Sequence, residues 1–268
     1  MAIADRYDAF LVDFDGVVWR GREPVPGAPE ALSEMLAAGK RLAFVTNNPG
    51  RLPEDYARRL AALGVEVAPA RVVTAGAAAA RLAARAADGG GAFVVGAPAL
   101  KELVARAGAP VLEGEAGREA AVVVVSAHAG FDYAELRTAK LALDGGAAFI
   151  ATSRDPTMPM PGGDWPGTGA VLAAVETAAG RRAEIAGKPE RHLFEAALEA
   201  IGAAPAEGGE EPPRVAMVGD RLTSDVAGGR AAGLDTVLVL TGATGREAAA
   251  AADPRPDHVV ADLPALLA

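Results

Sequence analysis

Short apolar runs alternate with helix-like segments along almost the whole chain, and this alternation restricts the fold more than any other feature. Residues 9–12, AFLV, precede a segment whose apolar residues recur at helical spacing up to Gly39. Residues 41–48, RLAFVTNN, then follow the pattern of a buried strand, and residues 52–64, LPEDYARRLAALG, that of a helix. This β-α-β-α order predicts an α/β fold with a Rossmann-like parallel sheet covered by helices.

The same order returns near the end of the chain, where the apolar runs RVAMVGD and DTVLVLTG flank a helix-like segment. Three more apolar runs lie in the middle third: GAFVVG, AAVVVVSAHAG and AAFIATSRD. Because the middle third carries no charged cluster comparable with those of the outer parts, we expect it to form an inserted domain. The sequence therefore predicts a core of residues 1–76 and 184–268 and an inserted α/β domain of residues 77–183.

Composition limits the partners and compartments of this chain. It contains no cysteine, which excludes disulfides and thiolate metal sites. A formal net charge of -9 without any Lys/Arg run argues against a nucleic-acid or anionic-membrane partner. No apolar run reaches the roughly 18 residues that span a bilayer, and the first residues are acidic, unlike a signal peptide. We therefore expect a cytoplasmic protein, with a surface loop at residues 202–213, which are rich in Gly, Pro and Glu.

Polar clusters end three of the apolar runs, and they are Asp13-Phe14-Asp15, Thr46-Asn47-Asn48 and Gly219-Asp220. In an open α/β sheet, ligand groups gather at the carboxyl ends of the strands, so we expect the three clusters to face one crevice. Two carboxylates at the end of a buried strand are costly unless a cation or a proton compensates them. The pair suits a division of labour between a nucleophile and a proton donor, although acidic turns are about as common without any catalytic role.

Further charged residues could complete such a site. Mg²⁺ usually takes one or two protein carboxylates besides water and phosphate oxygens, so Asp13 with Asp220 would suffice. Asp225, taken alone, is interpreted as the N-cap of a helix that begins at Val226, and Lys188, taken alone, as a surface residue. The Thr-Asn-Asn cluster suits phosphate oxygens as well as it suits an ordinary loop.

The charges of these residues predict a metal requirement. If the four aspartates and Lys188 converge while Asp15 is protonated, three negative charges face one positive charge. Such a site would repel a phosphate dianion. We therefore expect it to be inert towards phosphate unless a divalent metal is bound.

Four motifs of the chain resemble those of the haloacid dehalogenase superfamily of phosphohydrolases, and they occur in the family's order: DFDGVVW, TNN, GKP and GDRLTSDVAGGRAAGLDTVLVLTG. Within that superfamily the chain is similar to the NagD-like, p-nitrophenylphosphatase-like subfamily, class IIA, which has a large C2-type α/β cap. The first motif reads DGVV where many members of the superfamily have DGT. Valine is usual in this subfamily, so we infer no loss of activity from it.

The resemblance implies a role for each site residue. Asp13 is expected to be the nucleophile that forms an aspartyl-phosphate, and Asp15 the general acid and then base. The residues implied to hold the phosphoryl group are Thr46, Asn47, Asn48 and Lys188. Mg²⁺ is implied to bind Asp13, the backbone carbonyl of Asp15, and Asp220, with Asp225 supporting the metal site.

The resemblance also implies that the inserted domain is a cap between the second and third motifs, where residues 77–183 lie. A cap of this kind closes over the crevice and excludes water. We expect Asp155 and the turn GGDWPGTG to lie near that crevice, although they could equally be cap turns without contact. The resemblance further implies a homodimer through the caps.

Three functions stay open at this stage. The first is a Mg²⁺-dependent phosphatase for phosphomonoesters of small metabolites, such as a sugar phosphate, glycerol phosphate, phosphoglycolate, pyridoxal phosphate or a nucleotide monophosphate. The second is a phosphomutase or phosphotransferase on the same scaffold; Asp15 argues against a metal-free dehalogenase, which needs no acid there. The third is a catalytically idle sensor that binds a phosphorylated metabolite.

Overall fold

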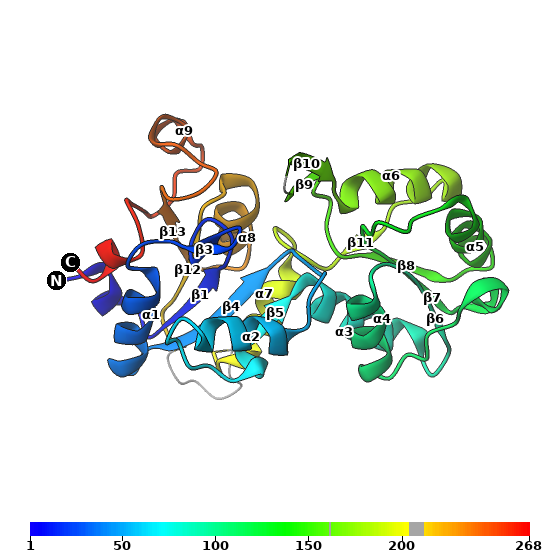
Figure 1. Ribbon diagram of the computed structural model, residues 1–268, viewed down its shortest axis with the longest axis horizontal. Helices are drawn as coiled ribbons and strands as arrows, with labels where there is room; N and C mark the ends of the chain where they lie inside the picture. Colours follow the sequence, from blue (N-terminus) through cyan, green and yellow to red (C-terminus); the bar gives the residue numbers. More distant parts are fainter. Residues whose placement is uncertain (161, 204–211) are drawn as a thin grey trace. The chain divides into compact units, whose positions relative to one another are not determined.

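The computed structural model describes residues 1–160, 162–203 and 212–268, so most of the surface loop expected at 202–213 lies outside the described residues. The chain divides into two compact units (Figure 1). Unit 1 consists of residues 1–46, 53–73 and 188–268, and unit 2 of residues 47–52 and 74–187. The predicted insertion, 77–183, falls within unit 2.

Unit 1 contains a six-stranded sheet in the order β14-β13-β12-β1-β4-β5. The pairings β14 to β13, β13 to β12, β12 to β1 and β1 to β4 are all parallel. Every residue of β1 is buried, as expected for a central parallel strand with both faces covered. The strands are β1 (Ala9–Asp13), β4 (Arg41–Thr46), β5 (Val72–Thr74), β12 (Val215–Gly219), β13 (Asp235–Val239) and β14 (His258–Val260).

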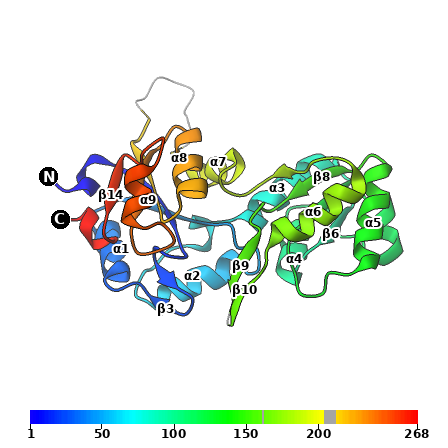
Figure 2. The same ribbon diagram turned by 90° about the horizontal axis from the view of Figure 1, so that it is seen from above.

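Helices cover both faces of this sheet, and Figure 2 shows α1 and α2 on one side and α8 on the other. On the first side, Leu32 and Met35 of α1 and Leu60 of α2 share one core with Phe10 and Val12 of β1. The helices are α1 (Ala28–Ala37), α2 (Pro53–Ala61), α7 (Arg191–Ala200), α8 (Ala227–Ala231) and α9 (Arg246–Ala251). The helices predicted before Gly39 and within 52–64 are therefore confirmed as α1 and α2.

Shorter elements connect the strands of unit 1. A hairpin of β2 (Trp19–Arg20) and β3 (Glu23–Pro24) follows β1. A helical turn with i to i+5 hydrogen bonds, Leu222–Val226, precedes α8. Short 3-10 helices are formed in unit 1 at Ile3–Arg6, Pro69–Arg71 and Pro264–Leu266, and in unit 2 at Gly114–Glu119.

Unit 2 contains a four-stranded parallel sheet in the order β11-β8-β7-β6. Its strands are β6 (Ala92–Val95), β7 (Val122–Val125), β8 (Ala148–Ala151) and β11 (Glu184–Ile185). The first three of these strands are the apolar runs predicted in the middle of the chain. A two-stranded antiparallel hairpin, β9 (Thr157–Met160) and β10 (Gly163–Pro166), follows β8 and includes part of the predicted GGDWPGTG turn.

Helices cover the two faces of the unit 2 sheet as well, with α3 and α4 on one side and α5 and α6 on the other in Figure 1. Leu143 of α5 and Leu172 of α6 share a core with Val123 and Phe149 of the sheet. The helices are α3 (Ala75–Ala87), α4 (Pro98–Arg106), α5 (Tyr133–Asp144) and α6 (Thr168–Ala179). The predicted α/β class with parallel sheets is thus confirmed. Within the described ranges, no helix has the length and apolarity that a membrane crossing requires.

Candidate active site

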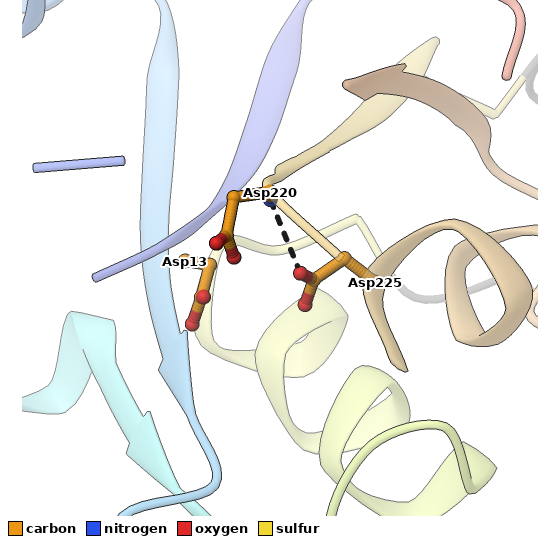
Figure 3. Close-up of side chains that lie close together, drawn as sticks. All are labelled: Asp13, Asp220 and Asp225. Atoms are coloured by element: carbon orange, nitrogen blue, oxygen red, sulfur yellow. Dashed lines mark hydrogen bonds between the residues drawn. The ribbon is translucent and has the colours of Figure 1, made fainter. Parts of the chain in front are cut away.

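The carboxyl ends of three neighbouring strands of unit 1 bring the first site residues together. β1 lies between β12 and β4, and all three strands run in the same direction. Asp13 ends β1 opposite Val45 of β4, so Thr46 extends one residue beyond it, and Asp220 follows directly after β12. The carboxylates of Asp13, Asp220 and Asp225 lie close together in Figure 3.

Lys188 is buried between two of these carboxylates. Its Nζ atom lies 2.6 Å from Asp13 Oδ1 and 2.6 Å from Asp225 Oδ1. Only 5% of Lys188 and 6% of Asp13 is exposed to solvent, so the interpretation of Lys188 as a surface residue is wrong. Burial alone would lower the pKa of Lys188, but the two carboxylates outweigh burial and raise that pKa above its ordinary value. Lys188 is therefore a fixed positive charge beside Asp13.

Asp225 is not the N-cap of a helix that begins at Val226. It lies inside the helical turn Leu222–Val226, and its Oδ2 accepts a 3.2 Å hydrogen bond from the backbone N–H of Asp220 (Figure 3). The backbone N–H of Arg221 donates a second one, of 3.0 Å, to the same oxygen. The helical turn begins at Leu222, earlier than the sequence indicates, and these two hydrogen bonds hold the backbone after β12 close to Asp225. The side chain thus fixes the backbone of Asp220.

The carboxylate of Asp220 is closely surrounded by backbone atoms. Its Oδ2 accepts a 2.6 Å hydrogen bond from the backbone N–H of Ala243, while its Oδ1 is buried and has no hydrogen-bond partner among the described residues. A Cβ atom at Gly16 or Gly242 would collide with this carboxylate, and Gly16 also has a φ of +86°, which favours glycine. The two glycines therefore leave just enough room for the side chain of Asp220.

This group of carboxylates fits a divalent metal ion. Asp13, Asp220 and Asp225 each offer an oxygen within 4.8 Å of the others, and carboxylate oxygens are the ligands that Mg²⁺ prefers. Burial raises the pKa of Asp13 and of Asp220, so their negative charges are not fully compensated by the protein's own groups. The buried Oδ1 of Asp220 could bind such an ion. The expected contribution of Asp15 through its backbone carbonyl stays a prediction.

Asp15 is exposed to solvent, unlike Asp13, Asp220 and Asp225. Its Oδ1 accepts a 3.2 Å hydrogen bond from the indole N–H of Trp19. The protein atoms packed around the carboxyl group raise its pKa above the ordinary value, although Trp19 and Lys188 oppose that shift. The pKa of Asp13 is raised as well, so the two roles follow from the surroundings: the exposed Asp15 suits a proton donor, whereas Asp13, held by Lys188, suits a nucleophile.

The three residues of the second motif divide between the two units. Thr46 is buried at the end of β4 in unit 1. Asn47 and Asn48 belong to unit 2, where Asn47 Nδ2 donates a 3.1 Å hydrogen bond to Asp155 Oδ2 and Asn48 Oδ1 accepts one of 2.9 Å from the N–H of Gly50. The structure thus brings Asp155 to Asn47. Their contact with a phosphoryl group stays a prediction.

Sequence reasoning missed two features of the site. Trp19 stands out in the sequence only as part of the first motif, although an aromatic residue four positions after Asp15 is a possible partner of its carboxyl group. Gly242 stands out in the sequence only as the last residue of the fourth motif, and its closeness to Asp220 arises where two loops from different strands meet.

Known proteins resemble this chain over almost its whole length. The family model for haloacid dehalogenase-like hydrolases matches residues 10–110, and a HAD-hydrolase-like model matches residues 185–266. Glycerol-3-phosphate phosphatase of Gallus gallus is 39% identical, covering 90% of this chain and 82% of the relative.

Two solved structures share the fold. Glycerol phosphate phosphatase from Mycobacterium tuberculosis, solved in complex with magnesium, superimposes with a TM-score of 0.88 at 35% identity, covering 99% of this chain and 78% of that one. The p-nitrophenyl phosphatase from Archaeoglobus fulgidus gives a TM-score of 0.86 at 32% identity, covering 96% and 97%. The motifs, the sheet order and these likenesses agree: the chain belongs to the haloacid dehalogenase-like hydrolases, in the NagD-like, p-nitrophenylphosphatase-like subfamily.

Proposed function

We propose that this protein is a Mg²⁺-dependent phosphatase that hydrolyses phosphomonoesters of small metabolites through an aspartyl-phosphate on Asp13. The observation that carries this proposal is the burial of Lys188 between Asp13 and Asp225, in a site where Asp220 Oδ1 has no hydrogen-bond partner in the part of the chain that the structure describes. Lys188 favours the ionised form of Asp13 against the effect of burial and fixes its orientation, and the three carboxylates provide the place for a metal ion.

The proposed reaction has two steps. In the first, a carboxylate oxygen of Asp13 attacks phosphorus, the bond from phosphorus to the ester oxygen breaks, and the carboxyl proton of Asp15 passes to that oxygen. In the second, Asp15 takes a proton from water, whose oxygen attacks the phosphorus of the aspartyl-phosphate and releases inorganic phosphate and free Asp13. The positive charge of Lys188 stabilises the phosphoryl oxygens, and Thr46, Asn47 and Asn48 hold them.

A bound Mg²⁺ would be held by Asp13 and Asp220, with the backbone carbonyl of Asp15 and with Asp225 as support, and would neutralise charge on the phosphoryl oxygens. The local charge makes this role necessary. With Asp15 protonated, the carboxylates of Asp13, Asp220 and Asp225 outnumber the single ammonium group of Lys188. The protein's own groups would therefore repel a phosphate dianion.

In this proposal unit 1 is the catalytic core and unit 2 the cap that selects the substrate. Glycerol 3-phosphate is the first substrate to test, because the Gallus gallus and Mycobacterium tuberculosis relatives are named for glycerol phosphate. In this division of roles the core binds the phosphoryl group and the metal, and unit 2 contacts the rest of the substrate. The identity of the metabolite therefore depends on residues of unit 2.

The test is phosphate release from a panel of phosphomonoesters, with and without Mg²⁺, by the wild type and by Asp13→Asn. We expect release that requires Mg²⁺ and that the substitution abolishes. Release that survives Asp13→Asn would contradict Asp13 as the nucleophile. An isomerised sugar phosphate in place of free phosphate would instead indicate a mutase, and tight binding without turnover a sensor.

The proposal includes a homodimer through unit 2 and a cytoplasmic location. Tyr133 and Leu141 of α5 support such a contact surface, because they are large apolar side chains that are 79% and 38% exposed. Light scattering of the purified protein and of Tyr133→Ser tests the dimer. Cell fractionation tests the location.

A further inference from the structure

Trp19 donates its indole N–H to Asp15, the residue that the proposed function makes the proton donor. The distance from Trp19 Nε1 to Asp15 Oδ1 is 3.2 Å. Trp19 is 1% exposed, whereas the Asp15 side chain lies at the surface. A buried indole N–H needs an acceptor, and here the acceptor is an oxygen of a group that would otherwise rotate in solvent.

The indole ring cannot easily change its orientation. Phe14 stacks on it with a centroid distance of 4.4 Å and an interplanar angle of 9°, and the guanidinium carbon of Arg59 lies 3.8 Å from the ring centroid. Both groups pack closely against the indole ring and limit its rotation. Arg59 is itself fixed by a 2.7 Å hydrogen bond to the carbonyl of Gly21.

The backbone between Asp15 and Trp19 is equally constrained. The N–H of Gly16 donates a 2.7 Å hydrogen bond to the carbonyl of Trp19, and the N–H of Trp19 donates one of 3.2 Å to the carbonyl of Phe14. The hydroxyl of Thr241 donates a 2.6 Å hydrogen bond to the carbonyl of Gly16. The indole N–H therefore occupies a fixed position relative to the Cα atom of Asp15.

We propose that Trp19 is a positioning residue for the reaction: its N–H holds Asp15 Oδ1 and thereby directs Oδ2 to the ester oxygen of the substrate. The inference rests on the proposed function. In the first step the proton on Asp15 Oδ2 passes to the leaving oxygen while the bond from phosphorus to that oxygen breaks and the bond from Asp13 to phosphorus forms. Proton transfer requires this alignment, and an exposed carboxyl group samples several rotamers without it.

The alignment matters only when the leaving group needs a proton. An alkoxide from glycerol phosphate must be protonated as it leaves, whereas p-nitrophenolate is a stable anion and leaves without a proton. The value of kcat/KM reports only the steps up to the first irreversible one, so it isolates formation of the aspartyl-phosphate. The ratio of kcat/KM for the two substrates therefore measures proton donation apart from the rest of the site.

The experiment compares the wild type with Trp19→Phe on an alkyl phosphate that the wild type hydrolyses and on p-nitrophenyl phosphate. We expect kcat/KM for the alkyl phosphate to fall about tenfold and that for p-nitrophenyl phosphate to change less than about twofold, since general acid catalysis typically contributes more than such a loss. The matched control is Phe44→Leu, because Phe44 stacks on Phe14 at 5.3 Å but its apolar ring has no N–H or O–H to donate to Asp15. It weakens the same aromatic stack and should leave the ratio unchanged.

A second replacement keeps the inference testable if Trp19→Phe does not fold. Benzothienylalanine at position 19, in a Trp165→Phe background, retains the two-ring shape but lacks the N–H. We expect the same selective loss, measured against Trp165→Phe alone. An equal loss on both substrates, or no loss, would overturn the inference. Failure of the wild type to hydrolyse either substrate would instead contradict the proposed function.

Discussion

Lys188 and Asp13 form a buried ion pair whose Nζ and Oδ1 atoms are 2.6 Å apart, although the two residues are 175 positions apart in the sequence. The same ammonium group contacts Asp225. One lysine therefore balances two carboxylates in a place with almost no solvent. Removing the lysine would leave both carboxylates buried without its positive charge.

We expect Lys188→Met to lower both stability and activity. Breaking one side of a buried ion pair typically costs about 3–5 kcal/mol, so the midpoint of urea unfolding should fall clearly. Phosphatase kcat should fall at least about 100-fold, as on removal of other groups that stabilise developing charge. Because Mg²⁺ supplies positive charge to the same carboxylates, it should restore part of the lost stability but not the activity.

Lys101→Met is the control for that substitution. Lys101 pairs with Glu113 at 3.0 Å on the surface of unit 2, where an ion pair contributes about 1 kcal/mol or less. Near-normal unfolding and activity are expected. If Lys188→Met behaved like Lys101→Met, the buried ion pair would have no part in the reaction.

A substitution at Gly242 tests whether the position of the Asp220 carboxylate determines Mg²⁺ binding. A Cβ atom there would collide with Asp220 Oδ2, so Gly242→Ala must displace the carboxylate from its place beside Asp13. We expect the concentration of Mg²⁺ needed for half-maximal stabilisation against heat to rise at least about tenfold, because a displaced carboxylate ligand loses its geometry. Thermal unfolding at increasing Mg²⁺ measures this without relying on activity.

Gly245→Ala provides the matched control, since Gly245 lies in the same loop and nothing lies within 4 Å of the position of its Cβ atom. Its Mg²⁺ dependence should equal that of the wild type. Equal dependence in Gly242→Ala as well would show that Asp220 does not bind the metal.

Sequence patterns predicted the strand ends of this site but not the contacts made by side chains from distant segments. Asp13, Thr46 and Asp220 could be placed at one edge because parallel strands end together. Local patterns alone did not predict the burial of Lys188 or the position of Asp225 inside a helical turn, because both depend on contacts between distant segments of the chain. The resemblance to the family had placed Lys188 in the site. Local capping preferences favoured Asp225 as the N-cap of the following helix. In the structure its carboxylate instead accepts hydrogen bonds from the backbone N–H groups of Asp220 and Arg221, which precede it.

The same reasoning applies to Asn47, whose partner lies more than 100 positions away. Its Nδ2 donates to Asp155 Oδ2, so Asp155→Ala removes one of the contacts that orient the amide. If Asn47 holds the phosphoryl group, KM should rise about tenfold while kcat changes much less, because binding in the ground state and in the transition state is lost together. Steady-state kinetics check this, with Glu102→Ala, at an exposed position of α4 in the same unit, as the control. A fall in kcat alone would contradict a role in binding.

The stability of unit 2 should depend on pH through Glu176. Burial alone would raise the pKa of Glu176, but hydrogen bonds from Arg154, from the backbone N–H of Ala183 and from Arg182 outweigh it and lower the pKa to about 2. A lowered pKa in the folded state stabilises the protein above the ordinary value of 4.5, and this stability is lost as the pH falls towards about 2.

Glu176→Gln should therefore be less stable than the wild type by an amount on the order of 2 kcal/mol at neutral pH, and the difference should shrink steadily below a pH of about 4.5. Urea unfolding monitored between neutral pH and the lowest pH at which the protein stays folded measures the difference. Glu102→Gln, which removes the exposed ion pair of Glu102 with Arg106 in α4, is the control and should show almost no difference at any pH. A constant difference between Glu176→Gln and the wild type across this range would mean that Glu176 stabilises unit 2 by packing, not by its charge.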